Sequence, residues 1–539
     1  MISAIARRRP AHWRVRRHTL LMVMVAALLG GCAAVPASAP PSAAPEQASA
    51  LQACQAWFNA LDGQTDASGV RDAAAARVAG HAYLRVDRFT ASLIDRLPAQ
   101  PDAAGGQAAH DQWIERLLAL DRQARQHELA NLPSAAVRGL ATRFDLADRP
   151  AMLAYTKVCG SLLADAQLGT PAQSTTLRQH LVVPDDYVDA YRVLGLYPLM
   201  RIPFLAGVRQ FEEQTRKRFA AGAHAAVGEQ RLRLWPPGSI ATGAANGRDD
   251  PRAKPHTASG NALGVPMPTA EQAQWLFERH APVFDLAIAG TDDQPGALTW
   301  DGTASDRPAP WPRVDVAQPV VYRQLAHTRA GETSLLQLVY TIWFGARTPG
   351  TAPIDLLAGR IDGLVWRVTL SPDGAPLVYD SIHPCGCYHL FFPAPGVMPR
   401  PAPADQAEWA FSPASAPALK ADQRILLRVA SASHYLEGIG VLDNTAASGA
   451  SMSYQWRDYD ALRALPMPGG SSRSVFGPDG FMPGTDRLES WLFWPMGIAR
   501  AGAMRQWGHH ATAFVGRRHF DDARLFEQRF DLGAVLPGE

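Results

Sequence analysis

The sequence predicts an α+β protein, with a helical N-terminal part followed by a mostly antiparallel, β-rich domain with added helices. From residue 51 to about 225, apolar residues recur at the spacing of amphipathic helices. From about residue 318, short segments rich in Val, Leu, Tyr, Trp and Thr alternate with turn residues, which is typical of strands. A hydrophobic content of 47% and a charged content of 19% are ordinary for a globular protein and argue against disorder.

The helical part shows its clearest pattern from His110 to Leu129, and Leu132-Pro133 is expected to end that helix. The stretch from Tyr187 to Phe204 is apolar, but it contains charged residues and two prolines. We therefore expect a buried or interfacial segment, broken at Pro198 and Pro203, and no membrane span. A charged helix with a solvated face is predicted from Phe211 to Ala221.

Residues 236–268 are dense in Gly, Pro, Asn and Asp and show no periodicity, which predicts a linker or long loop. They separate a helical domain, residues 51–235, from a β-rich domain, residues 269–539. Thr269 and Gln272 have the spacing of a capping box, which predicts a short helix to about His280.

Strands are predicted in the β-rich domain wherever β-branched and aromatic residues run between turn signals. They cover residues 319–327, 335–344, 364–370, 377–382 and 424–431. Ser371-Pro372-Asp373-Gly374 is a tight-turn sequence, so the third and fourth of these strands are expected to form a hairpin.

The first 31 residues have the three zones of an export signal. Six arginines between positions 7 and 17 form a basic zone, and the apolar run from Thr19 to Leu29 is too short to span a bilayer. Leu29-Gly30-Gly31-Cys32 follows, with small side chains before the cysteine. The alternative to a specialised signal is an ordinary signal peptide followed by an unrelated cysteine.

This arrangement resembles the lipobox of bacterial lipoproteins, and the resemblance covers only the leader and Cys32. It implies that Cys32 is the lipid-bearing first residue of the mature chain, so that the membrane is a partner through the anchor. Ala33, where inner-membrane lipoproteins have Asp, implies the outer membrane and a periplasm-facing protein. Residues 32–50 are rich in Ala, Pro and Ser and are expected to act as a tether.

The charge balance excludes one class of partner. The formal net charge is +2, and part of it belongs to the basic leader. The mature chain is therefore near neutral or acidic, and no nucleic-acid partner is expected.

Five cysteines are present, and four remain after Cys32 is assigned to lipid. Outside the cytoplasm, an even number favours disulfides. Cys54 and Cys159 are one candidate pair, whose bridge would close a loop of about a hundred residues. Cys385 and Cys387 are the other candidate pair.

The segment from Tyr379 to His389 collects more ligand-type residues than any other part of the chain, with His383, Cys385, Cys387 and His389 in alternation. On a straight strand the outer two would stand ~20 Å apart. One metal ion needs its donors within ~2.3 Å, so the segment would have to bend. Pro384 and Gly386 are the residues that would let it bend.

Three interpretations of this segment remain open. The first is a transition-metal site for zinc or copper, with Asp380 as a ligand or as the acceptor that orients a histidine. Its further candidate ligands are His434, His509 and His519. The second is a Cys385–Cys387 disulfide. The third is a structural corner of buried histidines and small cysteines.

A second candidate pair is His519 with Asp521, either as ligands or as a general base with its orienting carboxylate. The bland interpretation, which we favour, is a solvated charge cluster that includes Arg518 and Asp522.

Two functions follow for the whole protein. One is a lipid-anchored envelope protein with a metal-dependent, hydrolase-like site, for which Asp380, His383 and His389 are the catalytic candidates. The alternative is a non-catalytic envelope lipoprotein that acts as a binding or structural module. The sequence contains no GxSxG, HExxH or phosphate-loop motif that would favour a particular enzyme.

Overall fold

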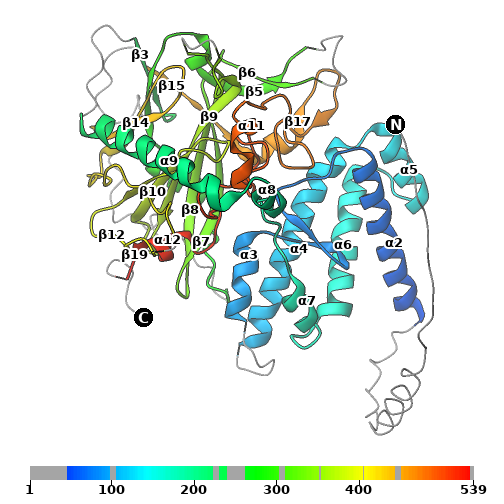
Figure 1. Ribbon diagram of the computed structural model, residues 1–539. Helices are drawn as coiled ribbons and strands as arrows, with labels where there is room; N and C mark the ends of the chain where they lie inside the picture. The colour runs from blue at the N-terminus through cyan, green and yellow to red at the C-terminus, as the bar shows by residue number, and fades with distance from the viewer. Residues whose placement is uncertain are drawn as a thin grey trace, which may run out of the picture. The chain divides into compact units, whose positions relative to one another are not determined.

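The computed structural model describes residues 45–97, 105–221, 230–238, 261–302, 310–350, 354–404, 406–443 and 451–533. Leu51–Glu539 form one compact unit, and Met1–Ala50 form a separate one. The α+β class is confirmed, because helices come first and mostly antiparallel sheets follow (Figure 1). Within the described ranges, no helix has both the length and the apolar character to cross a membrane.

The helical part consists of several helices and one short hairpin. Its elements are α2 (Pro45–Ala67), β1 (Ala76–Val78), β2 (His81–Val86), α3 (Arg88–Ser92), η1 (Leu93–Arg96), α4 (Gly106–Asn131), α5 (Ser134–Phe144), α6 (Arg149–Leu168), α7 (Thr175–His180), α8 (Asp189–Leu194) and α9 (Tyr197–Ala220). The helix predicted from His110 to Leu129 is confirmed as α4. The hairpin β1–β2 is a pair of strands that the sequence prediction did not include.

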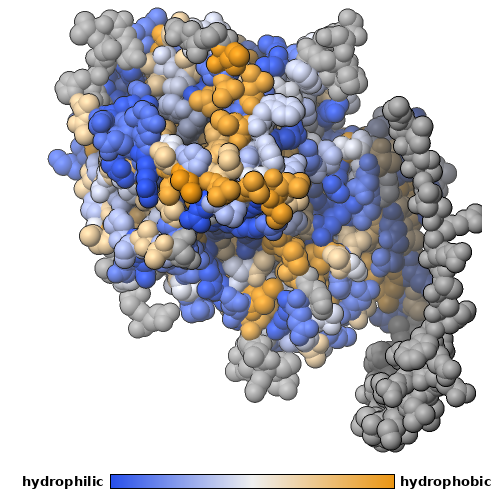
Figure 2. Space-filling model, viewed as in Figure 1, coloured by the Kyte–Doolittle hydropathy of each residue, from blue (hydrophilic) through white to orange (hydrophobic). Residues whose placement is uncertain are grey.

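The break predicted at Pro203 is wrong, because α9 continues through it. Pro198 lies in the first turn, where a missing N–H has no helical partner to lose. Pro203 lies further inside, and packing of α9 offsets its lost hydrogen bond: Phe211 and Phe219 pack against the core of the β-rich part. The C-terminal end of α9 is hydrophilic and its N-terminal end hydrophobic (Figure 2).

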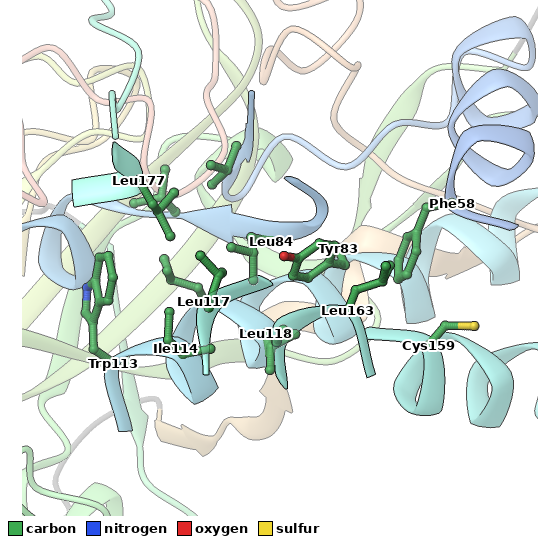
Figure 3. Packing of buried hydrophobic residues seen from close by; sticks show 14 of the residues in the cluster. Phe58, Tyr83, Leu84, Trp113, Ile114, Leu117, Leu118, Cys159, Leu163 and Leu177 are labelled. Carbon is green, nitrogen blue, oxygen red and sulfur yellow. The ribbon is translucent and has the colours of Figure 1, made fainter. Parts of the chain in front are cut away.

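The core of the helical part forms where α4 and α6 pack on β2. Trp113, Leu117 and Leu118 of α4 are buried, as their helical spacing predicts, and Figure 3 shows Leu118 on the side of Tyr83 and Leu163, with Trp113 at the opposite end of the cluster. One further link is covalent, because Cys54 of α2 and Cys159 of α6 form a disulfide, as predicted.

Buried charges join this helical core to the C-terminal half of the chain. Arg85 is fully buried and pairs with Asp121 and Glu128 of α4. Asp72 pairs with Arg463 at 2.8 Å, although 391 residues separate them in sequence. Removing one partner of such a buried pair costs about 3–5 kcal/mol, so these contacts fix how the two halves meet.

The larger sheet has eight strands. They are β5 (Pro295–Trp300), β6 (Pro312–Asp315), β7 (Val320–Ala330), β8 (Thr333–Arg347), β9 (Gly359–Leu370), β10 (Pro376–Ile382), β11 (Leu390–Pro393) and β16 (Gln455–Asp458). The order is β11-β10-β9-β8-β5-β6, with β7 pairing both β8 and β16. The predicted hairpin is confirmed, since β9 and β10 are antiparallel and Gly374 donates to the Ser371 carbonyl in the turn.

The second sheet has five strands, in the order β14-β13-β4-β3-β15. They are β3 (Arg231–Trp235), β4 (Val283–Ala287), β13 (Gln423–Val429), β14 (Leu436–Asp443) and β15 (Ser451–Ser453). Side chains of this sheet, of the larger sheet and of α10 (Ala270–His280) share one hydrophobic core, so the sheets face each other. Thr269 caps α10 by accepting from the Gln272 N–H, as predicted. Of the expected linker, residues 239–260 lie outside the described residues.

The remaining elements are short. They are η3 (Thr291–Asp293), β12 (Met398–Pro399), η4 (Tyr459–Ala464), β17 (Leu465–Pro466), β18 (Ser472–Arg473), α11 (Ser490–Phe493), η5 (Trp494–Met496), α12 (Leu525–Arg529) and β19 (Phe530–Asp531).

The disulfide makes a prediction about stability. Cys54 and Cys159 are 105 residues apart, so their bridge restricts the unfolded chain strongly. The double variant Cys54→Ala/Cys159→Ala should lose roughly 3–5 kcal/mol of unfolding free energy. Urea unfolding of the Cys32→Ser protein, followed by circular dichroism, measures it. Dithiothreitol should lower the wild-type midpoint toward that of the variant and leave the variant unchanged, and equal midpoints without reductant would contradict the assignment.

Candidate functional site

The chain bends sharply where the sequence predicts it. After β10, the Gly386 N–H donates to the His383 carbonyl and the His383 N–H to the Cys387 carbonyl. Gly386 has a φ of +91°, and a Cβ there would lie 2.5 Å from the Ala511 carbonyl oxygen. Only glycine fits this position. The bend places the alternating histidines and cysteines in different surroundings.

Asp362 of β9 is the centre of a buried polar cluster. Its carboxylate accepts from Nδ1 of His383 at 3.2 Å and from Nδ1 of His434 at 3.0 Å, and it has Arg487 at 3.4 Å. Burial raises the pKa of Asp362, but the charges of His383 and Arg487 and the histidine hydrogen bonds outweigh it. The pKa is therefore well below its usual value, and the group is a carboxylate.

His434 extends the cluster to a second carboxylate. Its Nε2 lies 3.3 Å from an Asp293 oxygen, and its ring stacks on Phe344 with centroids 4.0 Å apart. Burial lowers the pKa of His434, but hydrogen bonds to Asp293 and Asp362 raise it more, so the net shift is upward. Asp293, His434, Asp362 and His383 thus form one continuous chain of polar contacts.

Backbone strain gathers at the same place. Among the described residues, seven non-glycine residues have positive φ. Four of them flank this cluster: Ile361, Tyr388, Ala432 and His434. Such conformations cost of order 1–3 kcal/mol each and persist only where the surroundings enforce them, which is common at functional sites.

His389 belongs to a separate group. Asp380 accepts from His389 Nε2 at 2.8 Å and from the Arg367 guanidinium at 2.9 and 2.6 Å. Asp380 therefore orients a histidine, which is one of its two predicted roles. Burial lowers the pKa of His389 to about 3, so its ring is neutral.

His509 and His519 contact other carboxylates. His509 Nδ1 is 2.8 Å from Asp186, and His519 Nε2 is 3.1 Å from Asp185. The candidate pairing of His519 with Asp521 is not formed, since His519 contacts Asp185 and Asp521 pairs with Arg88 at 3.1 Å.

The expectation of a solvated charge cluster is also wrong for Arg518. Its exposed fraction is 3%, because it donates to carbonyl oxygens and to the Thr512 hydroxyl within the C-terminal fold.

The predicted metal ligands do not converge. Across the described ranges, no group of three or more His, Cys, Asp and Glu side chains is arranged to hold a metal ion. The geometry gives the metal interpretation no support, because each of these histidines already contacts a carboxylate. His383 and His434 contact Asp362, His389 contacts Asp380 and His509 contacts Asp186.

Cys385 and Cys387 are free thiols, not the disulfide that the sequence left open. A hydrogen bond between them lowers the pKa of Cys385 and raises the pKa of Cys387. Only Cys387 faces the cavity described next.

A cavity of about 500 Å³ lies between α9 and the bent segment. Its apolar walls come from α9, from the loop before β13 and from the C-terminal part. They are Met200, Pro203, Phe204, Val208, Phe211, Trp409, Phe411, Leu492, Phe493 and Phe514. Its polar end is formed by Cys387, Tyr388, His389, Tyr435 and Glu489, and its lining also includes Glu212, Glu408, Thr512 and Arg518. The sequence identified Cys387 and His389, and the other members come from segments that only the fold brings together.

Glu489 is the one acid at this end with a strongly shifted proton affinity. Its exposed fraction is 2%. Burial raises the pKa of Glu489 to about 7, although the charges of Arg487 and Arg347 oppose the rise. Arg347 also donates to the Tyr435 hydroxyl at 2.9 Å and lies over the Tyr388 ring. The polar end therefore combines a carboxyl that is half protonated near neutral pH with two tyrosines and a cation.

Two other cavities, of about 600 and 830 Å³, lie elsewhere in the described part of the chain. Charged groups in the first pair with one another, as Arg463 does with Asp460 and Arg323 with Asp458. Neither contains the segment from His383 to His389.

In comparisons with known proteins, no family model, curated protein or solved structure matches this chain.

The assignment of Cys385 and Cys387 as free predicts the number of thiols in the protein. Of the five cysteines, one is replaced in the Cys32→Ser protein and two form the disulfide, so 5 − 1 − 2 = 2 thiols remain. Titration with Ellman's reagent in guanidinium chloride without reductant should give two. A count of zero would show that Cys385 and Cys387 are joined, and a count of four would contradict the Cys54–Cys159 bridge.

Glu489 predicts a pH dependence of stability. Its pKa is about 7 in the folded protein against an ordinary 4.5, so between these values the folded state holds the extra proton. Its contribution to the unfolding free energy therefore falls as pH rises through this window. Glu489→Gln cannot ionise, so its stability relative to wild type should improve by up to ~3 kcal/mol from pH 4 to pH 8. Urea unfolding at both pH values measures this, and a constant difference would rule out the buried, protonated carboxyl.

Proposed function

We propose that this chain is a lipid-anchored envelope protein that binds an amphipathic small molecule, with an apolar chain, in the cavity beneath α9. This is the binding-module alternative, with a site assigned to it. The observation that supports it most is that two features occur at the same place. The segment that the sequence marks as chemically dense lines a cavity whose walls are mostly apolar, with Glu212, Glu408 and Arg518 as further charged lining residues.

The cavity has the dimensions and chemistry of a small-molecule site. About 500 Å³ lies within the 300–1,000 Å³ typical of ligand pockets. Burying each methylene of an acyl chain contributes roughly 0.8 kcal/mol, so ten contribute about 8 kcal/mol before the cost of association. Because 8 kcal/mol alone corresponds to a dissociation constant of about 1 μM, the cost of association leaves a weaker value, between micromolar and millimolar, for a medium-length chain.

The polar end suits an uncharged or hydrogen-bonding head group. Glu489 can donate when protonated and accept when ionised, and Tyr388 lies beside it at the cavity wall. Asp362 and its histidines lie behind this end and hold its backbone, because Tyr388 contacts the His383 ring at 5.0 Å between centroids.

Binding is favoured over nucleophilic catalysis by the state of the thiol in the cavity. A catalytic cysteine needs a lowered pKa, commonly from a neighbouring histidine. The pKa of Cys387 is instead raised, first by its hydrogen bond with Cys385 and then by burial.

Gly207 offers a direct test, because it lines the cavity and a Cβ there would meet no atom within 4 Å. Gly207→Trp should fill the cavity without straining α9. Gly139→Trp is the matched control, since Gly139 is also an exposed helical glycine with open space, on α5. Wild type and Gly139→Trp should bind dansyl-undecanoic acid saturably, and Gly207→Trp should bind at least about tenfold more weakly, a loss of ~1.4 kcal/mol.

Fluorescence titration of the Cys32→Ser protein gives the three dissociation constants. Equal affinity in Gly207→Trp and wild type would place the probe elsewhere and contradict the proposal. Absence of saturable binding to the wild type would contradict it as well.

A further inference from the structure

The entrance region of the cavity carries an unusual set of exposed apolar side chains. We call it the apolar rim, and it consists of Val193, Leu194, Leu196, Leu199, Ile202 and Trp491. Their exposed fractions run from 60% for Leu196 to 81% for Trp491. Single exposed apolar residues are ordinary, whereas a contiguous group of large ones marks a surface that contacts another apolar phase.

The rim is contiguous although α11 is almost 300 residues from α8 in sequence. The Tyr191 and Trp494 rings lie 6.1 Å apart, and the Phe204 and Phe493 rings 5.3 Å apart, in edge-on contacts. These contacts join α8 and α9 to α11 and η5 directly beneath the rim. In Figure 2, hydrophobic side chains gather over α8 and the first turns of α9 and continue toward α11.

We infer that the apolar rim docks on the surface of a lipid bilayer, from which the apolar chain of a lipid reaches the cavity. The inference rests on the proposed function only for what enters the cavity. The rim, its charges and the length of the tether support docking independently of that function.

The exposed side of α9 changes from apolar to charged along the helix, as expected of a helix at a membrane interface. Leu199 and Ile202 are 65% and 66% exposed in the first turns. About two, three and four turns after Ile202, Arg209, Glu213 and Lys217 are exposed. A helix of this kind places its apolar end at the acyl boundary and its charged end among head groups or water. Trp491 fits the same depth, since Trp is favoured at membrane interfaces.

The charge around the rim favours an anionic surface. From Tyr187 to Phe211 the chain has three arginines and one acid, Asp189. Arg517 pairs with both Asp185 and Asp189, and Arg192 donates to the carbonyl oxygens of Met496 and Gly516 and thus keeps its charge. Basic residues near an anionic bilayer contribute about 1 kcal/mol each.

The tether sets the distance over which docking operates. Twelve residues, 33–44, separate the proposed lipid-bearing Cys32 from the start of α2. Fully extended, they span at most ~43 Å. A protein held this close to a bilayer meets it repeatedly, so even weak apolar contacts lead to docking.

Cavity and rim share a border. Leu199 and Ile202 alternate along α9 with Met200 and Pro203, which line the cavity. A chain leaving the bilayer at the rim therefore enters the cavity within one helical turn.

The test uses the Cys32→Ser protein, which has no lipid of its own, and vesicles of phosphatidylethanolamine and phosphatidylglycerol in a 3:1 ratio. Flotation should recover wild type with the vesicles. Leu199→Glu/Ile202→Glu/Trp491→Glu should partition at least about tenfold more weakly. The control Val158→Glu/Val182→Glu/Met452→Glu adds the same charge at exposed apolar residues outside the rim and should float like wild type.

Circular dichroism and dansyl-undecanoic acid binding establish that the rim variant is folded and that its cavity is intact. Gly207→Trp should float normally while losing probe binding, so failure of docking and failure of the binding function give different patterns. Docking is overturned if wild type stays with the soluble fraction or if the rim variant floats equally well. It is also overturned if light scattering shows a wild-type dimer that the rim variant abolishes without any vesicle binding, because the rim would then join two copies of this chain.

Discussion

The arrangement of the proposed site depends on one buried carboxylate, Asp362. It has no exposure to solvent, and an unpaired charge there would cost several kcal/mol. Its oxygens are satisfied by His383 and His434, with Arg487 close by, and these three residues come from three distant parts of the sequence. Holding them together forces the backbone into the positive φ values seen at Ile361, Tyr388 and His434. The favourable contacts of Asp362 thus offset the backbone strain next to the bend.

The bend in turn defines which side chains face the cavity. Gly386 packs against Ala511, and the chain beyond it presents Cys387 and Tyr388 to the space beneath α9. A continuous α9 is needed to close that space, and the aromatic contacts of Phe211 with Tyr388 and Tyr435 hold it there. Charged groups that pair with one another behind the cavity, and apolar side chains that line it, make a site suited to binding an amphipathic molecule.

Periodicity predicted the fold class well because the elements concerned bury one face each. The helix around Trp113, the strands β7 to β10 and the turn at Gly374 follow from local patterns. Pro384 and Gly386 were also identified as the residues that would let the segment bend, although the bend leaves His383 on Asp362 and His389 on Asp380. What could not be predicted depends on distant segments: Asp362, Glu489 and α9 carry no motif, and Pro203 was taken as a break although tertiary packing keeps α9 helical. The histidines illustrate the same limit, because their partners, Asp293, Asp186 and Asp362, were invisible to local spacing.

The central claim is that the cavity beneath α9 holds an apolar chain, and photo-cross-linking tests it most directly. The Cys32→Ser protein would be irradiated with a diazirine-bearing fatty acid, digested, and mapped by mass spectrometry. The account predicts adducts concentrated on α9 between Pro203 and Phe211 and on Leu492 or Phe493, all of which line the cavity. Adducts spread over the surface, or concentrated in another cavity, would contradict it.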